Sequence, residues 1–273
     1  MDVLCDTEYP IVLVHGVGFR DRKQLNYWGR IPDALVQHGA QVHYGNQDSH
    51  GSVESNALQL KNSIHKILDE TGATKVNILA HSKGGLDARY MISVLDMAEK
   101  VASLTTLSTP HRGSVTVDRL LALPDFIVKV ASVFINLWYR MLGDKLPDSY
   151  RLFHQLTTSF ADRFNGVTPD SDKVYYQSYA FVMNTARSDA FMSLPYLVVK
   201  RLEGANDGLI APASAEWGNF KGIVRSASKR GISHCDEVDM RRRCFTKVSK
   251  EGFVSDITFF YLSVVSDLRL RGL

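Results

Sequence analysis

Apolar and polar positions predict strands separated by helices over residues 9–107. Short apolar runs of the kind that form buried strands lie at 11–14, 41–44, 75–80 and 101–107. Between them, 52–68 and 86–95 carry apolar residues at helical spacing. Ser52 or Ser55 can cap the first of these helices, and Gly72 follows its end. Such alternation predicts a mainly parallel central sheet with helices on both faces.

The pattern changes at about 115–170, where large apolar residues recur without strand signals. They follow i, i+3, i+4 spacing at Phe126, Ile127, Val130, Phe134, Leu137, Trp138 and Met141. One interpretation is an ordinary packed helix, and the other is a lid whose apolar face covers an active site. Strand signals return at 174–182 and 197–202, and a last helix is predicted at 256–268. We therefore expect a single α/β domain over 1–273 with a helical lid or cap insertion.

Charge and hydropathy argue against nucleic-acid binding and against a membrane-spanning segment. The chain has 32 basic and 29 acidic residues, which is too balanced to predict nucleic-acid binding. The basic cluster at 241–243 is expected to be a solvated face, with weak attraction to anionic lipid as the alternative. The most apolar stretch, 120–142, contains Pro124, Asp125 and two basic residues, which argues against a transmembrane segment.

The cysteines and the first residues of the chain are used to predict the cellular compartment of the protein. Cys5, Cys235 and Cys244 form no disulfide framework, and free thiols are favoured over a Cys235–Cys244 bridge. The first eight residues are acidic and lack the basic and apolar regions of a signal peptide. We expect either a cytoplasmic protein or the mature form of a secreted one.

Ser82 is the candidate nucleophile. It lies in Ala80-His81-Ser82-Lys83-Gly84, between a predicted strand and a predicted helix, as a nucleophile elbow requires. The sharp turn demands small neighbours two positions away on each side, and Ala80 and Gly84 meet that demand. Donors for an oxyanion are expected from the backbone amides of Lys83, at a helix N-terminus, and Val17, in the glycine-rich turn after the first strand.

A serine nucleophile needs a base and an acid, and the chain offers both in a consistent order. Asp207 lies in an Asn-Asp-Gly turn after a predicted strand, and His234 is the one histidine that follows it. The order serine, aspartate, histidine is typical of α/β-hydrolases. Asp87 and Asp96 are expected to be helix-surface residues. Of the other histidines, His15 and His81 are expected to be structural, and His111 could line the site.

These motifs resemble those of bacterial triacylglycerol lipases of the α/β-hydrolase superfamily. The matching segments span most of the chain and lie at 9–16, 76–90, 104–114, 203–209 and 234–236. The resemblance implies an α/β-hydrolase fold and hydrolysis of fatty-acid esters through an acyl-serine intermediate. It also implies a triad of Ser82, Asp207 and His234 with an oxyanion hole at Val17 and Lys83. Position 83 is often Gln, His or Met in the family.

The same resemblance implies a structural calcium ion beside the histidine loop, although the chemistry itself requires no cofactor. Asp236 matches one of the family's carboxylate ligands, and Asp189 is a guess for the second. Carboxylate oxygens suit calcium. The alternative is that Asp236 makes a local cap or salt bridge.

Two groups of alternatives remain beside the lipase interpretation. A short-chain carboxylesterase, an acyl thioesterase or an acyltransferase would use the same triad, because the leaving group and acceptor depend on pocket shape. A non-catalytic binding protein of the same fold is the alternative from another class, and an intact nucleophile, acid and base argue against it. The expected partner is a lipid or small ester, with transient contact at a lipid interface.

Overall fold

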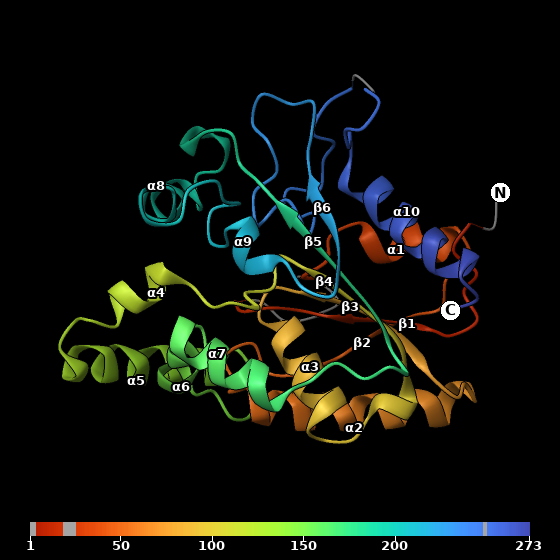
Figure 1. The fold of residues 1–273 in the computed structure, drawn as a ribbon, viewed down its shortest axis with the longest axis horizontal. Coiled ribbons are helices and arrows are strands. Elements are labelled where there is room, and N and C mark those ends of the chain that lie inside the picture. The colour runs from red at the N-terminus through yellow and green to blue at the C-terminus, as the bar shows by residue number, and fades with distance from the viewer. Residues whose placement is uncertain (1–3, 19–25, 248–249) are drawn as a thin grey trace.

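A parallel sheet of six strands forms the centre of the computed structural model, which describes residues 4–18, 26–247 and 250–273 (Figure 1). The strand order is β2-β1-β3-β4-β5-β6, and every neighbouring pair is parallel. The strands are β1 (Ile11–Val14), β2 (Val42–Tyr44), β3 (Val76–His81), β4 (Val101–Leu107), β5 (Tyr175–Phe181) and β6 (Asn219–Val224). This confirms the predicted fold class.

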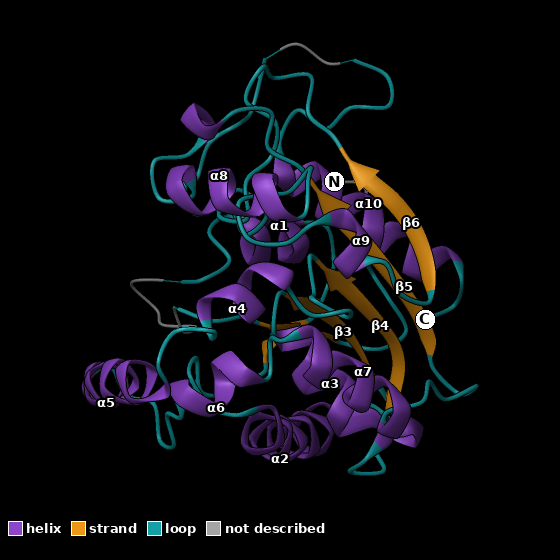
Figure 2. Cartoon of the chain, turned by 60° about the vertical axis from the view of Figure 1, so that its left-hand side comes forward, coloured by secondary structure: helices purple, strands orange, loops and turns teal. Residues whose placement is uncertain are grey.

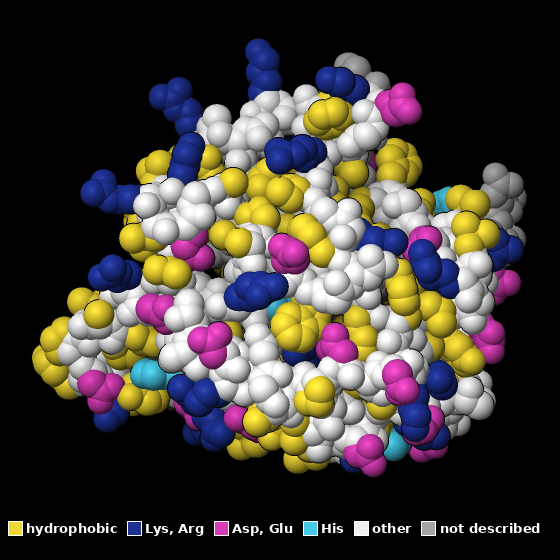
Figure 3. All heavy atoms as spheres, in the orientation of Figure 1, with side chains coloured by type: hydrophobic (Ala, Val, Ile, Leu, Met, Phe, Trp, Pro, Cys, Tyr) yellow, Lys and Arg dark blue, Asp and Glu magenta, His cyan; other side chains and the backbone are white. Residues whose placement is uncertain are grey.

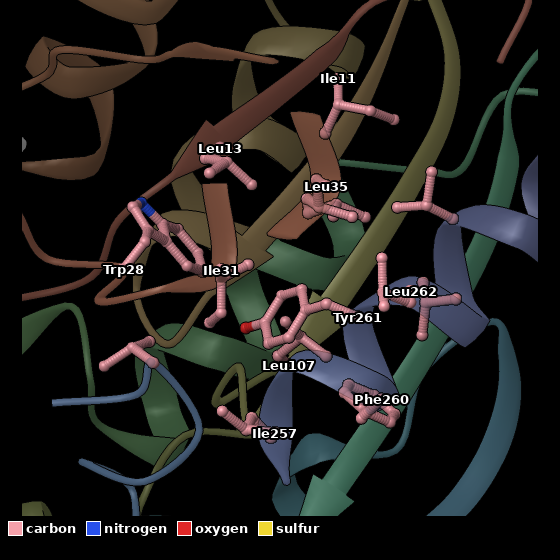
Figure 4. Packing of buried hydrophobic residues seen from close by; sticks show 14 of the residues in the cluster. Ile11, Leu13, Trp28, Ile31, Leu35, Leu107, Ile257, Phe260, Tyr261 and Leu262 are labelled. Atoms are coloured by element: carbon pink, nitrogen blue, oxygen red, sulfur yellow. The ribbon is translucent and has the colours of Figure 1, made fainter. Parts of the chain in front are cut away.

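Helices cover both faces of the sheet. Along β1, Ile11 and Leu13 pack into one apolar cluster while Val12 and Val14 pack into the other, because successive side chains of a strand point to opposite faces. The first cluster includes α1 (Ile31–Gln37) and α10 (Ile257–Leu270) and is filled by large side chains such as Trp28 and Tyr261 (Figure 4). The second includes α2 (Val53–Thr71) and α3 (Gly84–Ser93). Burial on both faces explains the continuous apolar runs.

Four helices lie between β4 and β5, in the interval where the sequence predicts helices. They are α4 (Val115–Leu120), α5 (Asp125–Met141), α6 (Ser149–His154) and α7 (Thr158–Val167). Figure 2 shows α5 at the edge of the molecule, away from the sheet, with α6 between it and α2. The first turn of α4 is capped by Ser114, whose side chain accepts a hydrogen bond from the amide of Val117. No helix of the described residues is long and apolar enough to cross a membrane.

The strand predicted at 197–202 is wrong, because these residues form the second half of α8 (Ser193–Leu202). The apolar run Leu197-Val198-Val199 suggested a strand, but a short run of this kind cannot be distinguished from a helix by its periodicity. In the fold, Tyr196 and Val199 are buried while Leu197 stays half exposed, which is helical spacing. β6 was not predicted, and neither were the short elements η1 (Ala98–Lys100), η2 (Ala186–Ser188) and α9 (Pro212–Ala215).

All three cysteines are free thiols, in agreement with the sequence expectation. Cys5 and Cys235 are buried, and burial raises the pKa of the Cys235 thiol to about 12. Cys235 therefore carries no thiolate at neutral pH, although it directly follows His234 in the chain.

Candidate active site

Ser82 lies in a sharp turn between β3 and α3, with its backbone in the left-handed region at φ 54°. Its carbonyl accepts hydrogen bonds from the Thr109 hydroxyl at 2.7 Å and from the Gly85 amide at 3.1 Å, and its own amide donates to a carbonyl of β4. A side chain larger than hydrogen is excluded at Gly16 and Gly84. A Cβ at Gly16 would lie 2.7 Å from the Ser82 Cβ, and one at Gly84 would lie 2.5 Å from a carbonyl oxygen. Close packing around the backbone of the turn holds the strained serine in place.

The backbone amides of Val17 and Lys83 lie where the sequence predicts donors. Lys83 is the N-cap of α3, directly after Ser82, so its N–H is among the free donors of a helix N-terminus. Val17 follows β1 and lines the same cavity as Ser82. Among the described residues, no carbonyl accepts a hydrogen bond from either amide. Both amides are therefore candidate donors to an oxygen of a ligand.

Asp207 and His234 form a buried pair. The Nδ1 atom of His234 lies 2.8 Å from Oδ2 of Asp207, and the His234 amide donates to the Asp207 carbonyl at the same distance. The other carboxylate oxygen accepts from the amides of Leu209 and Ile210, at 2.8 Å each. Burial alone would raise the pKa of Asp207, but the imidazole of His234 and these hydrogen bonds hold it well below its usual value. Asp207 therefore stays ionised and fixes the ring of His234.

The His234 ring lies beside the serine turn. Its centroid is 4.3 Å from that of His81, the residue before Ser82. The structure thus brings Asp207 and His234 beside the serine turn, although the three residues predicted from the sequence are far apart in the chain. Because Asp207 holds Nδ1, a base at this ring would have to act through the second ring nitrogen, Nε2.

A second buried carboxyl, Glu237, supports the pair, and sequence reasoning missed it. Its Oε1 accepts a hydrogen bond from the Ser108 hydroxyl at 3.0 Å, and its Oε2 lies 3.1 Å from Nε2 of His81. Burial, with the charge of Asp207 beside it, raises the pKa of Glu237 well above its usual value. Burial likewise lowers the pKa of His81 far below its usual value. Both groups are therefore neutral. The one signal in the sequence that could have pointed to Glu237 was its position in the turn after His234.

Below the serine, the side chain of Lys83 points into the protein. Its Nζ lies 2.6 Å from Oδ1 of Asp87, and Asn56 donates to the other oxygen of that carboxylate at 2.9 Å. The expectation that Asp87 lies on the helix surface is therefore wrong, since the residue is 1% exposed. Asp96 is exposed as expected. The unusual lysine after the nucleophile has a buried ionic partner, so its side chain does not face the cavity.

His111 does not line the site. It is fully buried, with Nε2 2.9 Å from the Thr106 hydroxyl and Nδ1 3.3 Å from the Arg89 guanidinium. Burial, followed by the charge of Arg89, lowers its pKa well below the usual value. His111 is thus a neutral structural residue that holds the loop after β4.

A cavity of about 600 Å³ opens beside Ser82. Its volume is within the usual range for small-molecule sites. Besides Ser82, its polar lining residues are Ser114 and Thr116. The other lining residues are apolar and come largely from the helical insertion and α8: Val17, Pro110, Val117, Leu120, Leu121, Leu123, Ile127, Val128, Ala131, Leu152, Phe153, Leu156, Leu194, Pro195, Val198, Val199, Leu209 and Ile210. Such a lining favours an extended apolar ligand.

The two carboxylates considered for calcium lie together, but an arginine fills the position between them. Arg241 donates from Nε to Oδ1 of Asp236 at 2.7 Å and from Nη2 to Oδ2 of the same carboxylate. The same Nη2 lies 3.8 Å from Oδ2 of Asp189. Carboxylates that already pair with the guanidinium of Arg241 cannot bind a metal ion unless that guanidinium moves away. Asp236 therefore makes the local salt bridge that was the alternative prediction.

Comparison with known proteins agrees with this fold. Residues 9–219 match the family model described as alpha/beta hydrolase fold. Triacylglycerol lipase 2 of Saccharomyces cerevisiae is 31% identical over 91% of this chain and 75% of that protein. A triacylglycerol lipase of Vibrio cholerae is 30% identical over 85% of the chain and 80% of its own length. The crystal structure of Staphylococcus hyicus lipase has the same fold, with a TM-score of 0.68 at 17% identity over 97% of this chain and 96% of that one.

Proposed function

This chain belongs to the α/β-hydrolase fold family and is a serine ester hydrolase related to triacylglycerol lipases, and we propose that it hydrolyses fatty-acid esters through an acyl intermediate on Ser82. The observation that carries the proposal is the buried Asp207–His234 pair beside the strained serine at an apolar cavity. The fold alone would not support it, because the same fold hosts many functions.

In the proposed cycle, Nε2 of His234 takes the proton of Ser82 as its Oγ attacks the ester carbonyl carbon. The oxygen of that carbonyl becomes an anion and accepts hydrogen bonds from the amides of Val17 and Lys83. His234, held by Asp207, then protonates the leaving alcohol, and the acyl group remains on Ser82. A water molecule repeats the sequence on the acyl-enzyme and releases the fatty acid.

The cavity supports a long acyl chain as the substrate feature that is recognised. Its walls from α4, α5 and α8 carry aliphatic side chains such as Leu121, Ile127 and Val198. Each methylene that leaves water for such a wall contributes about 0.8 kcal/mol. Longer chains are therefore expected to react with higher kcat/KM until the cavity is filled.

The outer face of α5 supports contact with a lipid surface. It exposes several large apolar side chains, among them Phe126, Val133, Phe134 and Met141, each more than 60% exposed. Figure 3 shows hydrophobic side chains at the left-hand end of the molecule, where α5 lies in Figure 1. Because the inner side of the same helix lines the cavity, docking of this face on a lipid would bring the cavity to the substrate.

The test is hydrolysis of p-nitrophenyl esters from acetyl to palmitoyl, together with the thioester of one long acyl chain. We expect rates to rise with chain length, and Ser82→Ala to lose about 10⁴-fold or more. Ser263→Ala, an exposed serine on α10, is the matched control and should keep full activity.

Other outcomes of the same test separate the alternatives. A preference for acetyl or butyryl esters would make the protein a short-chain esterase, and faster thioester cleavage would make it a thioesterase. The absence of Ser82-dependent hydrolysis on every ester would refute the proposed mechanism.

A further inference from the structure

The loop that carries His234 is tied to the segment before α8 by a cluster of charged groups outside the catalytic pair. The Oγ of Ser233 donates to Oδ2 of Asp189 at 2.7 Å, and the Ser233 amide donates to Oδ2 of Asp236 at 3.1 Å. Asp189 follows η2, and its Oδ1 accepts from the amide of Phe191 at 2.9 Å. Figure 1 shows this region above the carboxyl ends of the strands, close to α8.

The guanidinium of Arg241 lies at the centre of this cluster. It makes a two-pronged pair with Asp236 through Nε and Nη2, and its Nη1 donates to the Ser188 carbonyl at 3.0 Å. The Ser188 carbonyl also accepts from Arg230. Both carboxylates are only 5% exposed, whereas Arg241 is 23% exposed. Two carboxylates and a carbonyl thus surround one organic cation.

The oxygen atoms around Arg241 are the kind that hold a hard divalent cation, namely carboxylate and backbone carbonyl oxygens. Two buried carboxylates this close together repel each other, and a positive charge between them stabilises both. Arg241 supplies it, and Arg230 adds a second charge at the same carbonyl. With two arginines already beside the two carboxylates, an added calcium ion would be repelled by their positive charges. It could bind the oxygens only at the position that the guanidinium of Arg241 now occupies.

We propose that Arg241 is a built-in cation that replaces a structural metal ion in this protein, so that the His234 loop is held without calcium. The same argument implies that the oxygens form a latent cation site. Removal of the guanidinium should expose that site to calcium.

Thermal unfolding of three proteins tests the proposal, each in EDTA and in millimolar calcium or magnesium: the unchanged chain, Arg241→Gln, and the matched control Arg243→Ala. Arg243 lies two residues away, is exposed, and makes no hydrogen bond or ion pair with the described residues. In EDTA, Arg241→Gln should lower the Tm by roughly 5–10 °C, because it leaves two buried carboxylates without their cation. Calcium, and magnesium much less, should recover at least half of this loss. The unchanged chain and Arg243→Ala should have the same Tm under every condition.

Two results would overturn the proposal. If EDTA lowers the Tm of the unchanged chain and calcium restores it, a metal binds with Arg241 in place. If Arg241→Gln loses stability but does not respond to calcium, the oxygens form no cation site and the arginine is an ordinary salt bridge. Arg241→Lys keeps one charge at this position and should be intermediate in EDTA, which supplies a second variant if Arg241→Gln folds poorly. None of these readouts depends on ester hydrolysis.

Discussion

Helices α2 and α5 have almost the same length and both are amphipathic, yet they place their apolar faces in opposite environments. In α2, residues such as Leu60 and Ile64 are fully buried against the sheet. In α5, every residue of which is described, Ser132 is the one buried residue, and Phe134 is 69% exposed. One helix stabilises the fold with its apolar face, and the other presents its apolar face to the cavity and to the surroundings.

The way the two helices are attached explains the difference. α2 contacts α3 and shares an apolar cluster with β1 and β3, so its burial is part of the core. The insertion that contains α5 packs on α2 and α3 through an apolar cluster at α7, but the segment that follows α5 is joined to the core by polar contacts. Asp144 accepts from the amides of Ser49 and His50, and Asp48 accepts from those of Lys145 and Leu146, at 2.7 to 3.2 Å. Helical periodicity therefore identifies an apolar face without showing what covers it.

The largest expected effect is on stability and distinguishes the two helices directly. Ile64→Ala in α2 should lower the free energy of unfolding by about 3 kcal/mol, because it removes a fully buried side chain and leaves a cavity. Val133→Ala in α5, where the side chain is 64% exposed, should change it by less than about 0.5 kcal/mol. Urea unfolding measures both. Equal losses would mean that another molecule or segment covers α5 in solution.

The second effect tests the polar attachment of the insertion through pH. The imidazole of His50 stacks on Tyr139 of α5 with ring centroids 3.7 Å apart, and its Nδ1 lies 2.9 Å from the Ser149 hydroxyl of α6. Burial, and to a smaller extent the charge of Lys83, lowers the pKa of His50 to about 4. The unfolded chain, with an ordinary histidine pKa of about 6.5, therefore binds the proton more tightly between these two values, and stability must fall as the pH falls through this window.

From pH 7 to pH 5 this single group should contribute a loss of about 2 kcal/mol. His50→Gln removes the titration and should flatten the decline of unfolding free energy by that amount, as measured by urea unfolding at both pH values. His65→Gln, an exposed histidine on α2, is the control and should leave the decline unchanged. An identical decline in the unchanged chain and His50→Gln would show that the insertion is not held by a neutral His50.

Local signals explain how much of the site could be predicted from the sequence. The serine turn, the amide of Lys83 and the order of Asp207 and His234 depend on short motifs whose geometry is nearly independent of the rest of the chain. The strands buried on both faces were found for the same reason. The edge strand β6 was missed because it is partly exposed and its residues, Asn219 to Val224, show neither a continuous apolar run nor strict alternation.

Buried polar partners could not be predicted in this way. Glu237, Asp87 and Arg241 each look like ordinary surface residues in the sequence, and each owes its role to a partner supplied by tertiary packing. The same is true of α8, where a Leu-Val-Val run favours a strand until its packing beside the cavity is known. Charged residues are rarely buried unless paired, and single-sequence patterns do not reveal the pair.

The smallest expected effect tests the exposed side of α5 in catalysis. Phe134→Ser removes one exposed aromatic ring from the face proposed to contact lipid, and a side chain of this size that is only partly inserted contributes about 1 kcal/mol. Hydrolysis of an emulsified triacylglycerol should therefore fall roughly fivefold, while hydrolysis of a dissolved short-chain ester should not change. Leu58→Ser on α2, a residue that is 54% exposed and lies outside this face, is the matched control.

If both variants slow the emulsion reaction equally, general surface hydrophobicity is responsible and α5 has no special role. If Phe134→Ser slows both substrates, its effect lies in the cavity, and the outer face of α5 would be no more a docking surface than the exposed side of α2.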